Sequence, residues 1–491
     1  MAKKEQVKKE FDKGAKGISI GKNDNFSEWY TEVVQKCELA DLRYNVKGFL
    51  VFQPWSVLSM EKMYGFMEKV LQRKGHKPYW YPTLIPEGNL KKESAHIKGF
   101  NPQVFWVTEA GNDKLEERLF LRPTSETAFY QMFKLWLRSY KDLPFKTYQR
   151  ANVFRYETKA TRAFLRSREF HWIETHCAHA SEEDAMKQVK EDVETTQEVM
   201  HDTFGLPFIF FERPAWDRFP GAHRTFAADV LNPDGRLVQQ PSTHLLKQDF
   251  SKAFDVKFKD KDGKEKYVWI TCYGPAISRI FASIITVHGD DKGLRFPWAI
   301  APLQVAIVPV VEDSKVLKKA EELKKEIEKF ASVEIDLSEK SAGEKFNFWE
   351  MKGVPIRIDV GPKDISAKKL TVFRRDLDKK EVIAEKDLMK YLAKVGEESG
   401  KNLTKQADKL FDNRVKDVKS VGEMKKAIES GFIARANFCS VEMDGAKCAE
   451  VVEKDVGATV RGTKLEKEKA SGKCVVCNKP GKHVVYIAKQ Y

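Results

Sequence analysis

The 491-residue sequence lacks a long hydrophobic run, because no apolar stretch approaches the roughly 18 residues that a membrane-spanning helix needs. The lysine-rich start, MAKKEQVKKEFDKGAKG, is followed by no apolar segment, so we do not expect a secretory signal. Fixed-period repeats and long low-complexity tracts are also missing. These absences argue against membrane and repeat proteins, and we expect no membrane partner.

Cysteine is scarce, with 7 residues in the chain. Cys37, Cys177 and Cys272 are scattered, and we expect them to be reduced thiols in the core. So small and odd a number does not fit a disulfide scaffold, and it favours a cytoplasmic protein.

The other four cysteines form two pairs near the C-terminus. Eight residues separate Cys439 from Cys448, and the C-x2-C motif of Cys474 and Cys477 follows 25 residues later. Two such pairs suit tetrahedral Zn²⁺, although the first spacing is wider than usual. Disulfides are the alternative. With four protein ligands, the role of the zinc would be structural.

Positive charge is abundant, since 86 Lys and Arg residues face 72 Asp and Glu residues, a formal net charge of +14. This excess favours a polyanionic partner, nucleic acid first, but it is also typical of a soluble, lysine-rich protein. The length and the 42% hydrophobic content suit two to four packed domains.

The chain divides into four predicted parts. We expect a flexible basic tail over residues 1–24, a domain of helices and aromatic-rich strands over 25–300, an α/β domain over 301–400 and a cysteine-bearing domain over 401–491. The α/β prediction rests on alternating strand and helix patterns, such as QVAIVPV followed by SKVLKKAEELKKEIEKF.

The segment FRYETKATRAFLRSREFHWIE, residues 154–174, alternates charged with aromatic residues. Arg155 and Glu157 would share one face of a first strand. A second strand would place on one face Arg166, Arg168, Phe170, Trp172 and Glu174. The polar residues 158–165 would form a mobile connection. Arginines, a carboxylate and an aromatic ring suit ATP, although a ladder of cross-strand ion pairs is the alternative.

This segment resembles motif 2 of the class II aminoacyl-tRNA synthetases. The stretch MEKVLQRKGHKPYWYPTLIP resembles motif 1, with Pro82 at the dimer-interface position, and CYGPAISRIFASII resembles motif 3, with Arg279. The resemblance implies a catalytic α+β domain, in which helices flank an antiparallel sheet, and it implies a homodimer.

Finer stretches resemble the prolyl-tRNA synthetases of the short archaeal/eukaryotic type, from Asn25 to Tyr491. They are NFSEWY, RPTSET, TVHGDDKGL, KFNFWEMKGVPIRIDVGPKDI and YIAKQY. The resemblance implies ATP-dependent attachment of L-proline to tRNA(Pro) through prolyl-adenylate, with Mg²⁺ at the phosphates and a structural Zn²⁺. It also implies an anticodon-binding domain over 301–400 and a terminal carboxylate of Tyr491 near the active site.

The resemblance also implies the substrate contacts. Those expected at ATP are Arg155, Glu157, Arg166, Phe170, Gln239, Ser242 and Arg279. Those expected at proline are Thr124, Glu126, Arg155, Trp172, Glu174, His176 and His244. The attacking carboxylate is already ionised, so positioning and charge stabilisation by Arg155 and Arg279 would carry catalysis. Thr124 is also a plausible helix N-cap, and His176 could be a core histidine.

Several positions depart from the family pattern. Ser242 stands in a threonine position, Pro241 changes the backbone beside it, and Ala276 replaces a glycine. His223 and Arg224 stand where acidic or aromatic residues are expected. These changes leave proline selectivity open. Because only 100 residue steps separate Glu174 from Gly274, we expect no editing domain between motifs 2 and 3.

In the predicted anticodon-binding domain, the resemblance implies base contacts by Phe346, Glu350, Arg357, Lys363 and Asp364. An ion pair between Arg357 and Glu350 is the alternative, and Arg374 and Arg375 are expected at phosphates. Two other functions stay open. One is a class II synthetase paralogue with altered amino-acid specificity. The other is a non-catalytic tRNA-binding relative, and the intact motif arginines argue against it.

Overall fold

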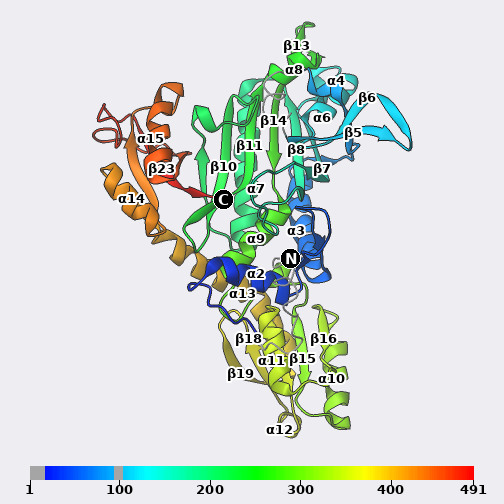
Figure 1. The fold of residues 1–491 in the computed structure, drawn as a ribbon. Coiled ribbons are helices and arrows are strands. Elements are labelled where there is room, and N and C mark those ends of the chain that lie inside the picture. The colour runs from blue at the N-terminus through cyan, green and yellow to red at the C-terminus, as the bar shows by residue number, and fades with distance from the viewer. Residues whose placement is uncertain (1–16, 93–102) are drawn as a thin grey trace. The chain divides into compact units, whose positions relative to one another are not determined.

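A computed structural model describes residues 17–92 and 103–491. Within it the chain forms two compact units. The larger unit comprises residues 40–287 and 398–491, and the smaller one combines residues 17–39 with 288–397. Figure 1 labels the elements of both units.

An eleven-stranded sheet organises the larger unit. In spatial order its strands are β20 (Val415–Asp417), β21 (Ile433–Phe438), β23 (His483–Gln490), β22 (Thr459–Lys464), β9 (Ile209–Glu212), β10 (Arg224–Leu231), β11 (Arg236–Lys247), β14 (Trp269–Gly274), β8 (Glu169–His179), β7 (Phe145–Phe154) and β3 (Lys77–Pro78). Neighbours from β22 to β7 are antiparallel, which confirms the predicted sheet.

Helices flank this sheet, as predicted. They are α3 (Pro54–Arg73), α4 (Glu87–Leu90), α6 (Glu126–Trp136), α7 (Glu182–Thr196), η4 (Gln197–Thr203, a π-helix), α8 (Asp249–Ala253), α9 (Ile277–His288), α14 (Val421–Glu429) and α15 (Ala446–Val456). The helix α7 packs across β8, β11 and β14, which explains why β8 is buried on both faces. Ser181 caps α7 by accepting from the Asp184 N–H.

Small sheets complete the larger unit. Their strands pair as β1 (Ala40–Asp41) with β2 (Val51–Phe52), β6 (Asp113–Leu121) with β4 (Leu84–Pro86) and β5 (Phe105–Ala110), and β12 (Lys257–Lys259) with β13 (Glu265–Tyr267).

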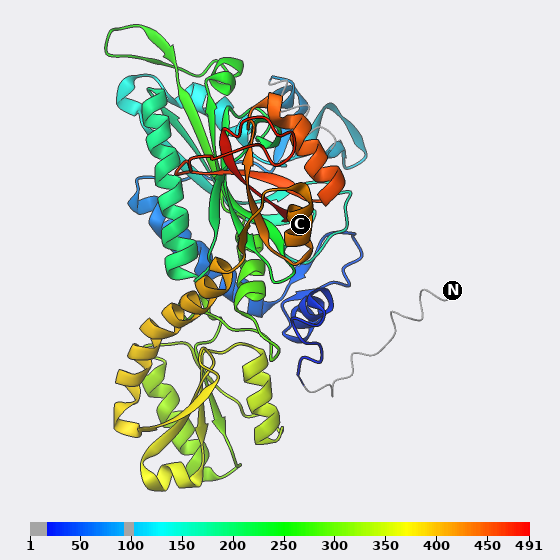
Figure 2. The ribbon, with the colours of Figure 1, turned by 90° about the vertical axis from the view of Figure 1, so that its left-hand side faces the viewer.

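The C-terminal strands extend the central sheet of the larger unit. Strand β22 pairs with β9, and the end of β23 pairs with the start of β11. Phe211 and Leu237 share a hydrophobic core with Ile433, Val484 and Tyr486. Figure 2 shows these red and orange strands beside the green ones. The C-terminal segment and the central sheet therefore share buried apolar surface.

The smaller unit has a five-stranded sheet with an α/β pattern. Its order is β16 (Val333–Ile335), β15 (Val305–Pro309), β17 (Ile356–Val360), β18 (Lys369–Arg374) and β19 (Lys379–Ala384). Its helices are α2 (Phe26–Lys36), α10 (Ser314–Ile327), α11 (Ala342–Met351), α12 (Pro362–Ala367) and the start of α13 (Leu388–Asp412). Parallel pairing of β15 with β16 and β17 agrees with the predicted strand–helix alternation.

Residues 1–16 of the predicted tail lie outside the described residues. Residues 17–24 are attached to the smaller unit, where the Lys22 ammonium donates to the Gly289 carbonyl at 2.6 Å. The predicted domain boundary at residue 400 falls inside α13. Among the described residues, no helix has the length and apolar character needed to cross a membrane.

Candidate active site

A cavity of about 300 Å³ opens in the larger unit against the central sheet. Its walls come from β8, β11 and β14, from the starts of α6 and α9, and from residues 217–220. The predicted site residues that line it are Thr124, Glu126, Arg155, Phe170, Trp172, Glu174, His176, Gln239, Ser242, His244 and Arg279. The structure therefore brings together most of the residues that were predicted to contact ATP and proline.

Strand β8 supplies one wall through simple alternation. Phe170, Trp172, Glu174 and His176 all line the cavity, because every second residue of a strand faces the same side. Strands β7 and β14 pair with β8 on its two sides, so these four residues belong to an interior strand of the sheet. The predicted face of this strand agrees with the structure at Phe170, Trp172 and Glu174. Arg166 and Arg168, predicted on the same face, precede the strand, which begins at Glu169.

The predicted hairpin geometry is wrong at the connection between its two strands. Strand β7 ends at Phe154 and β8 begins at Glu169, so residues 155–168 form the connection instead of the eight residues predicted. Arg155 and Glu157 therefore lie beyond the strand. Nor is the connection polar throughout, since Phe164 is buried and stacks on Phe52 with ring centroids 4.8 Å apart.

Glu157 and Arg166 are not among the residues that line the cavity. Both lie on the 155–168 connection, and the Arg166 Nε atom is 3.8 Å from a Glu157 carboxylate oxygen. Glu157, which was predicted to bind adenine, and Arg166, which was predicted to bind phosphate, therefore lie next to each other. Their nucleotide contacts stay predictions.

A β-bulge in β11 explains how its residues reach the cavity. Ala227 pairs with Ser242, whereas Asp229 pairs with Gln239, so β11 has an extra residue around Pro241. Proline cannot donate to a sheet ladder, and a bulge accommodates it. Residues three apart face opposite sides of a regular strand. The bulge places Gln239 on the same face as Ser242, and both line the cavity.

The strand of motif 3, β14, forms the floor. Cys272 and Gly274 both line the cavity, as alternate residues of one strand. A Cβ atom at Gly274 would lie 3.1 Å from the Trp172 ring, so a side chain here would displace that indole. Cys272 is buried, as predicted for a core thiol, but its place in the cavity was not predicted. Its sulfur and the ligand atoms of Glu126 and His176 lie within 4.8 Å of one another.

A buried carboxylate, Glu174, organises the polar end of the cavity. Its oxygens accept hydrogen bonds from the Ser125 hydroxyl at 2.5 Å, the Ser125 N–H at 3.2 Å and the Gln149 amide at 2.7 Å. His176 Nε2 lies 3.3 Å away. Burial alone raises a carboxyl pKa, but the hydrogen bonds from His176 and Ser125 and the charge of Arg122 bring the pKa of Glu174 below its usual value. Glu174 is therefore a carboxylate at neutral pH.

Thr124 and Glu126 lie beside Glu174 at the start of α6. The Thr124 hydroxyl donates to Glu126 at 2.6 Å, and both side chains are buried. The alternative role of Thr124 as the helix cap does not hold, because Ser125 occupies the N-cap position. The Ser125 hydroxyl donates to Glu174 and makes no capping hydrogen bond to α6. The start of the helix therefore supplies a hydrogen-bond donor to the site.

Arg155 and Arg279, two of the three arginines that line the cavity, were predicted there. Arg155 donates to the Pro123 carbonyl at 3.0 Å, and its guanidinium lies 5.1 Å from the Phe170 ring centroid. Arg279 donates to the Gln239 carbonyl at 3.2 Å. Burial, together with Arg155 and Arg166, lowers the pKa of Arg279 to about 10. Both guanidinium groups remain charged at neutral pH, so an anionic ligand would relieve their mutual repulsion.

His244 is held as a neutral imidazole. Its Nδ1 atom lies 3.0 Å from the Thr225 hydroxyl and its Nε2 atom 3.0 Å from the Ser242 hydroxyl. Burial and the positive charges of Arg213 and Arg155 lower its pKa to about 3. His244 therefore orients hydroxyl groups and does not contribute charge to the cavity.

Sequence reasoning missed the part of the wall that lies outside the strands. Asp217, Arg218, Phe219 and Pro220 line the cavity from the segment between β9 and β10. Phe219 packs on His244 with ring centroids 4.6 Å apart. The nearby sequence FPGAH contains turn residues, but no periodic pattern indicates which way such a segment faces.

The predicted anticodon residues all belong to the smaller unit, where Phe346, Glu350 and Arg357 are in contact. The guanidinium of Arg357 is 4.1 Å from the Phe346 ring centroid and donates to Glu350 at 2.7 Å. Lys363 is exposed near the start of α12, where Asp364 accepts from the Gly361 N–H. Arg357 is buried, so the ion-pair alternative describes this residue well, while base contacts stay a prediction.

Arg374 and Arg375 do not have the exposure expected for phosphate contacts. Both are buried. Arg374 pairs with Asp376 at 2.8 Å and Arg375 with Asp290 at 2.5 Å. They are structural ion pairs of the smaller unit, because buried guanidinium groups need carboxylate partners.

The four C-terminal cysteines converge in the larger unit. The sulfur atoms of Cys439, Cys448, Cys474 and Cys477 all lie within 4.8 Å of one another, and those of Cys439 and Cys448 are 3.7 Å apart. Sulfurs bound to zinc at about 2.3 Å in a tetrahedron would be about 3.8 Å apart. The arrangement fits a four-coordinate zinc ion better than a pair of disulfides, which join sulfurs at about 2 Å.

Comparisons with known proteins identify three domains along the chain. A model of the tRNA synthetase class II core domain (G, H, P, S and T) matches residues 105–288. An anticodon binding domain model matches residues 304–395, and a prolyl-tRNA synthetase C-terminal model matches residues 421–491. The fold, the cavity and these matches define a class II aminoacyl-tRNA synthetase.

Full-length relatives narrow the class. A proline--tRNA ligase of Thermofilum pendens is 46% identical over 97% of this chain and 99% of its own length, and one of Pyrococcus abyssi is 40% identical over 96% and 98%. A solved structure, Giardia lamblia prolyl-tRNA synthetase in complex with prolyl-adenylate, aligns with a TM-score of 0.93 at 36% identity, covering 96% of this chain and 100% of that one. The chain belongs to the proline--tRNA ligase family.

Proposed function

We propose that this protein attaches L-proline to tRNA(Pro) in two steps, with prolyl-adenylate as the intermediate. The observation that carries the proposal is the cavity itself, in which an acidic, hydrogen-bonded end adjoins a pair of arginines and an aromatic wall. The family to which the chain belongs supports the same reaction. ATP would be the second substrate, and the chain would act in the cytoplasm, where tRNA is charged for translation.

The acidic end suits the secondary ammonium of proline. This group has two N–H donors, and Thr124 and Glu126 offer acceptor atoms in a buried setting, while His176 would line the same end of the pocket. Trp172 and Cys272 provide the apolar surface that the pyrrolidine ring needs. Ser242 and His244 would close the same pocket from β11. A zwitterion fits because the carboxylate of proline can face Arg155 while its ammonium faces Glu126.

The arginine end suits the adenylation step. The carboxylate oxygen of proline attacks the α-phosphorus of ATP, the bond to the bridging oxygen breaks, and pyrophosphate leaves with that electron pair. Arg155 would hold the α-phosphate and the attacking carboxylate, while Phe170 and Arg279 would stack on the adenine. Gln239 would contact the nucleotide. Because the nucleophile is already ionised, catalysis rests on alignment and on charge stabilisation by fixed groups.

Glu157 and Arg166 would join the nucleotide site by exchanging partners. Each is partly exposed and pairs with the other. A triphosphate offers Arg166 a more highly charged partner, and the adenine amine offers Glu157 a donor. Mg²⁺ would enter with ATP and neutralise charge on its phosphate oxygens.

Amino-acid-dependent exchange of pyrophosphate into ATP tests the reaction and the role of Arg155. With Mg²⁺ present, we expect exchange with proline alone among the twenty amino acids. Arg155→Ala should lower it by roughly 100-fold or more, because a preorganised charge contact to a reacting group is lost. Arg118→Ala, which removes an exposed guanidinium paired with Glu87, serves as the matched control and should leave exchange unchanged.

Other outcomes of this experiment are informative. Exchange with a different amino acid would mean that the departures at Pro241, Ser242 and Ala276 changed the substrate. No exchange by folded, zinc-loaded protein would favour a non-catalytic tRNA-binding relative. Undiminished exchange in Arg155→Ala would remove this arginine from the mechanism.

The smaller unit would read the anticodon of tRNA(Pro). Anticodon bases are unstacked, so a protein reads them through aromatic stacking and edge hydrogen bonds. The ring of Phe346, which is partly exposed beside Arg357 and Lys380, provides such a surface. Glu350, Lys363 and Asp364 would supply the hydrogen bonds.

Replacing Phe346 separates tRNA recognition from amino-acid activation. We expect Phe346→Ala to raise the KM for tRNA about tenfold, since base–aromatic stacking contributes roughly 1–3 kcal/mol per base. Proline-dependent exchange without tRNA should stay at the wild-type rate. Phe330→Ala, at another exposed ring of the same unit, is the control for general loss of apolar surface. An unchanged KM for tRNA in Phe346→Ala would exclude a stacking role.

The cysteine cluster would hold one structural Zn²⁺. All four ligand positions of a tetrahedral ion are filled by Cys439, Cys448, Cys474 and Cys477, which leaves none for a substrate. Around the cluster, Cys448 and Cys474 belong to a core with Met424, Phe438 and Val452. Metal binding therefore stabilises the packing of the C-terminal module.

Metal analysis and thermal melting test this site together. We expect one zinc per chain, and we expect its removal by a chelator to lower the melting temperature because the free energy of metal binding is lost from the folded state. Cys474→Ser should lose zinc and melt earlier. Cys37→Ala changes a cysteine of the smaller unit and should keep the zinc. A zinc-free preparation that melts like the loaded one would contradict the proposal.

The larger unit also has a surface suited to a homodimer. Trp80 is 91% exposed between β3 and β4, and Val51, Leu58 and Leu84 of the same unit are also exposed. Trp80 also lines a second cavity with Tyr64 and His171. An indole so fully exposed is unusual on a monomer and typical of interface anchors. Its segment is the one that resembles motif 1, which includes Pro82.

Sedimentation velocity over a range of concentrations tests the dimer. We expect the wild-type protein to sediment as a dimer at micromolar concentration, and Trp80→Ala to shift the equilibrium toward monomer. Leu410→Ala removes an exposed apolar side chain elsewhere and should leave the dimer intact. A wild-type protein that stays monomeric at these concentrations would refute the proposal.

A further inference from the structure

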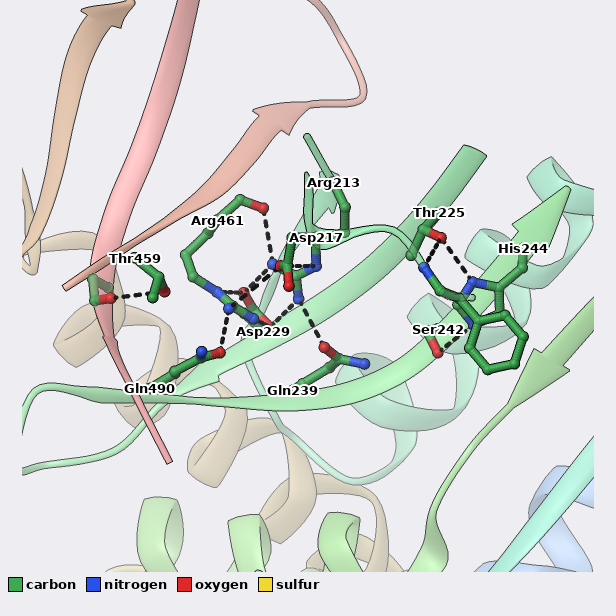
Figure 3. Close-up of polar contacts among 12 residues, drawn as sticks. Arg213, Asp217, Thr225, Asp229, Gln239, Ser242, His244, Thr459, Arg461 and Gln490 are labelled. Carbon is green, nitrogen blue, oxygen red and sulfur yellow. Dashed lines mark hydrogen bonds and ion pairs between the residues drawn. The ribbon is translucent and has the colours of Figure 1, made fainter. Parts of the chain in front are cut away.

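Two arginines bind a single buried carboxylate behind one wall of the cavity. Asp229 on β10 is 0% exposed and accepts from Arg213 at 2.7 and 2.9 Å and from Arg461 at 2.8 and 3.1 Å. Arg213 follows β9, whereas Arg461 belongs to β22, 232 residues from Asp229 in sequence. Figure 3 shows the two guanidinium groups converging on Asp229.

This cluster touches two residues that line the cavity. Arg213 donates to the side-chain oxygen of Gln239 at 3.4 Å, and Asp229 is the cross-strand partner of Gln239 beside the β-bulge. Asp217, on the facing segment, has a carboxylate oxygen 3.9 Å from Arg213 and 3.8 Å from Arg461. Neither arginine is itself among the lining residues.

Arg461 is also tied to the end of the chain. Its guanidinium donates to the Gln490 side chain at 2.5 Å, and its carbonyl accepts from Arg213 at 2.8 Å. The C-terminal strands thus supply one of the two arginines that bind Asp229. The burial of Asp229 raises its pKa, but Arg213 and Arg461 outweigh that effect and lower it to about 2, so the ionic contact persists at neutral pH.

The cluster is better explained by geometry than by stability. Removing charges from water is costly, and well-packed apolar residues often serve stability equally well. A bidentate guanidinium–carboxylate pair, in contrast, fixes direction as well as distance. Two such pairs around Asp229 leave Arg213 little freedom, and Arg213 in turn holds the Gln239 side chain.

We propose that Arg461 is a positioning residue of the nucleotide site, which acts through Asp229 and Arg213 to orient Gln239. The inference rests on the proposed function, in which Gln239 contacts ATP. The C-terminal module then contributes to ATP binding without touching the substrate. The opposite wall of the amino-acid pocket, at Thr124 and Glu174, lies outside this network.

Steady-state exchange kinetics with MgATP and proline test the proposal. We expect Arg461→Met to raise the KM for ATP about tenfold, with a change of less than about twofold in the KM for proline. Arg461→Lys should recover part of the loss, because a positive charge still faces Asp229. Arg435→Met, at a guanidinium of the same module that pairs with Asp417 and Glu468, is the control and should change neither KM.

A double mutant separates positioning from general destabilisation. If Arg461 acts through Gln239, the effect of Arg461→Met on the KM for ATP should shrink to less than about twofold in a Gln239→Ala background. Full additivity of the two changes would overturn the proposal. An equal rise in both KM values would also overturn it, because a general loss of structure would affect both substrates.

A milder variant keeps the proposal testable if Arg461→Met does not fold. Gln490 is exposed, so Gln490→Ala removes a partner of Arg461 while every charge stays in place. We expect a two- to threefold rise in the KM for ATP alone, and an unchanged KM would count against the proposal. If the wild-type protein shows no exchange, the proposed function fails. Titration of the same variants with MgATP would then still decide the positioning role.

Discussion

The buried carboxylate of Glu174 is the constraint on which the site depends. An ionised carboxylate in the protein interior costs several kcal/mol unless hydrogen-bond donors surround it. Ser125 from the start of α6, Gln149 from β7 and His176 from β8 meet that need. Each of these elements is thereby placed to within a hydrogen-bond length. The same contacts place Thr124 and Glu126, the neighbours of Ser125, at the cavity.

A second buried carboxylate, Asp229, imposes a similar constraint on the other side of the cavity. Its donors come from segments far apart in sequence, so this wall forms only when the C-terminal strands join the central sheet. The shared core of Phe211, Leu237 and Tyr486 provides the apolar contact that holds those strands there. Folding of the C-terminal module and completion of the Arg213–Asp229–Arg461 network are therefore coupled.

The sequence predicted those parts of the site that follow strand periodicity or resemblance to a family. Alternation in β8 placed Phe170, Trp172 and Glu174 on one face, as the structure has them. The same rule failed at Arg155, because the strand ends one residue earlier. It would also have placed Gln239 opposite Ser242, since a bulge changes the count by one. Contacts such as Asp229 to Arg461 carry no local signal, and only the fold brings their partners together.

The distribution of charge around the cavity also bears on specificity. Glu126 and Arg155 can each meet one end of an amino-acid zwitterion, but every amino acid has those two ends. Discrimination must come from the space between Trp172, Cys272 and Gly274 and from the secondary ammonium. A missing methylene changes binding by only about 1–3 kcal/mol, so smaller amino acids are excluded weakly by shape alone. A site that satisfies both N–H donors of a secondary ammonium discriminates by orientation as well. In the proposed pocket, the fixed acceptors at Thr124 and Glu126 would therefore be as important to the choice of proline as the apolar wall.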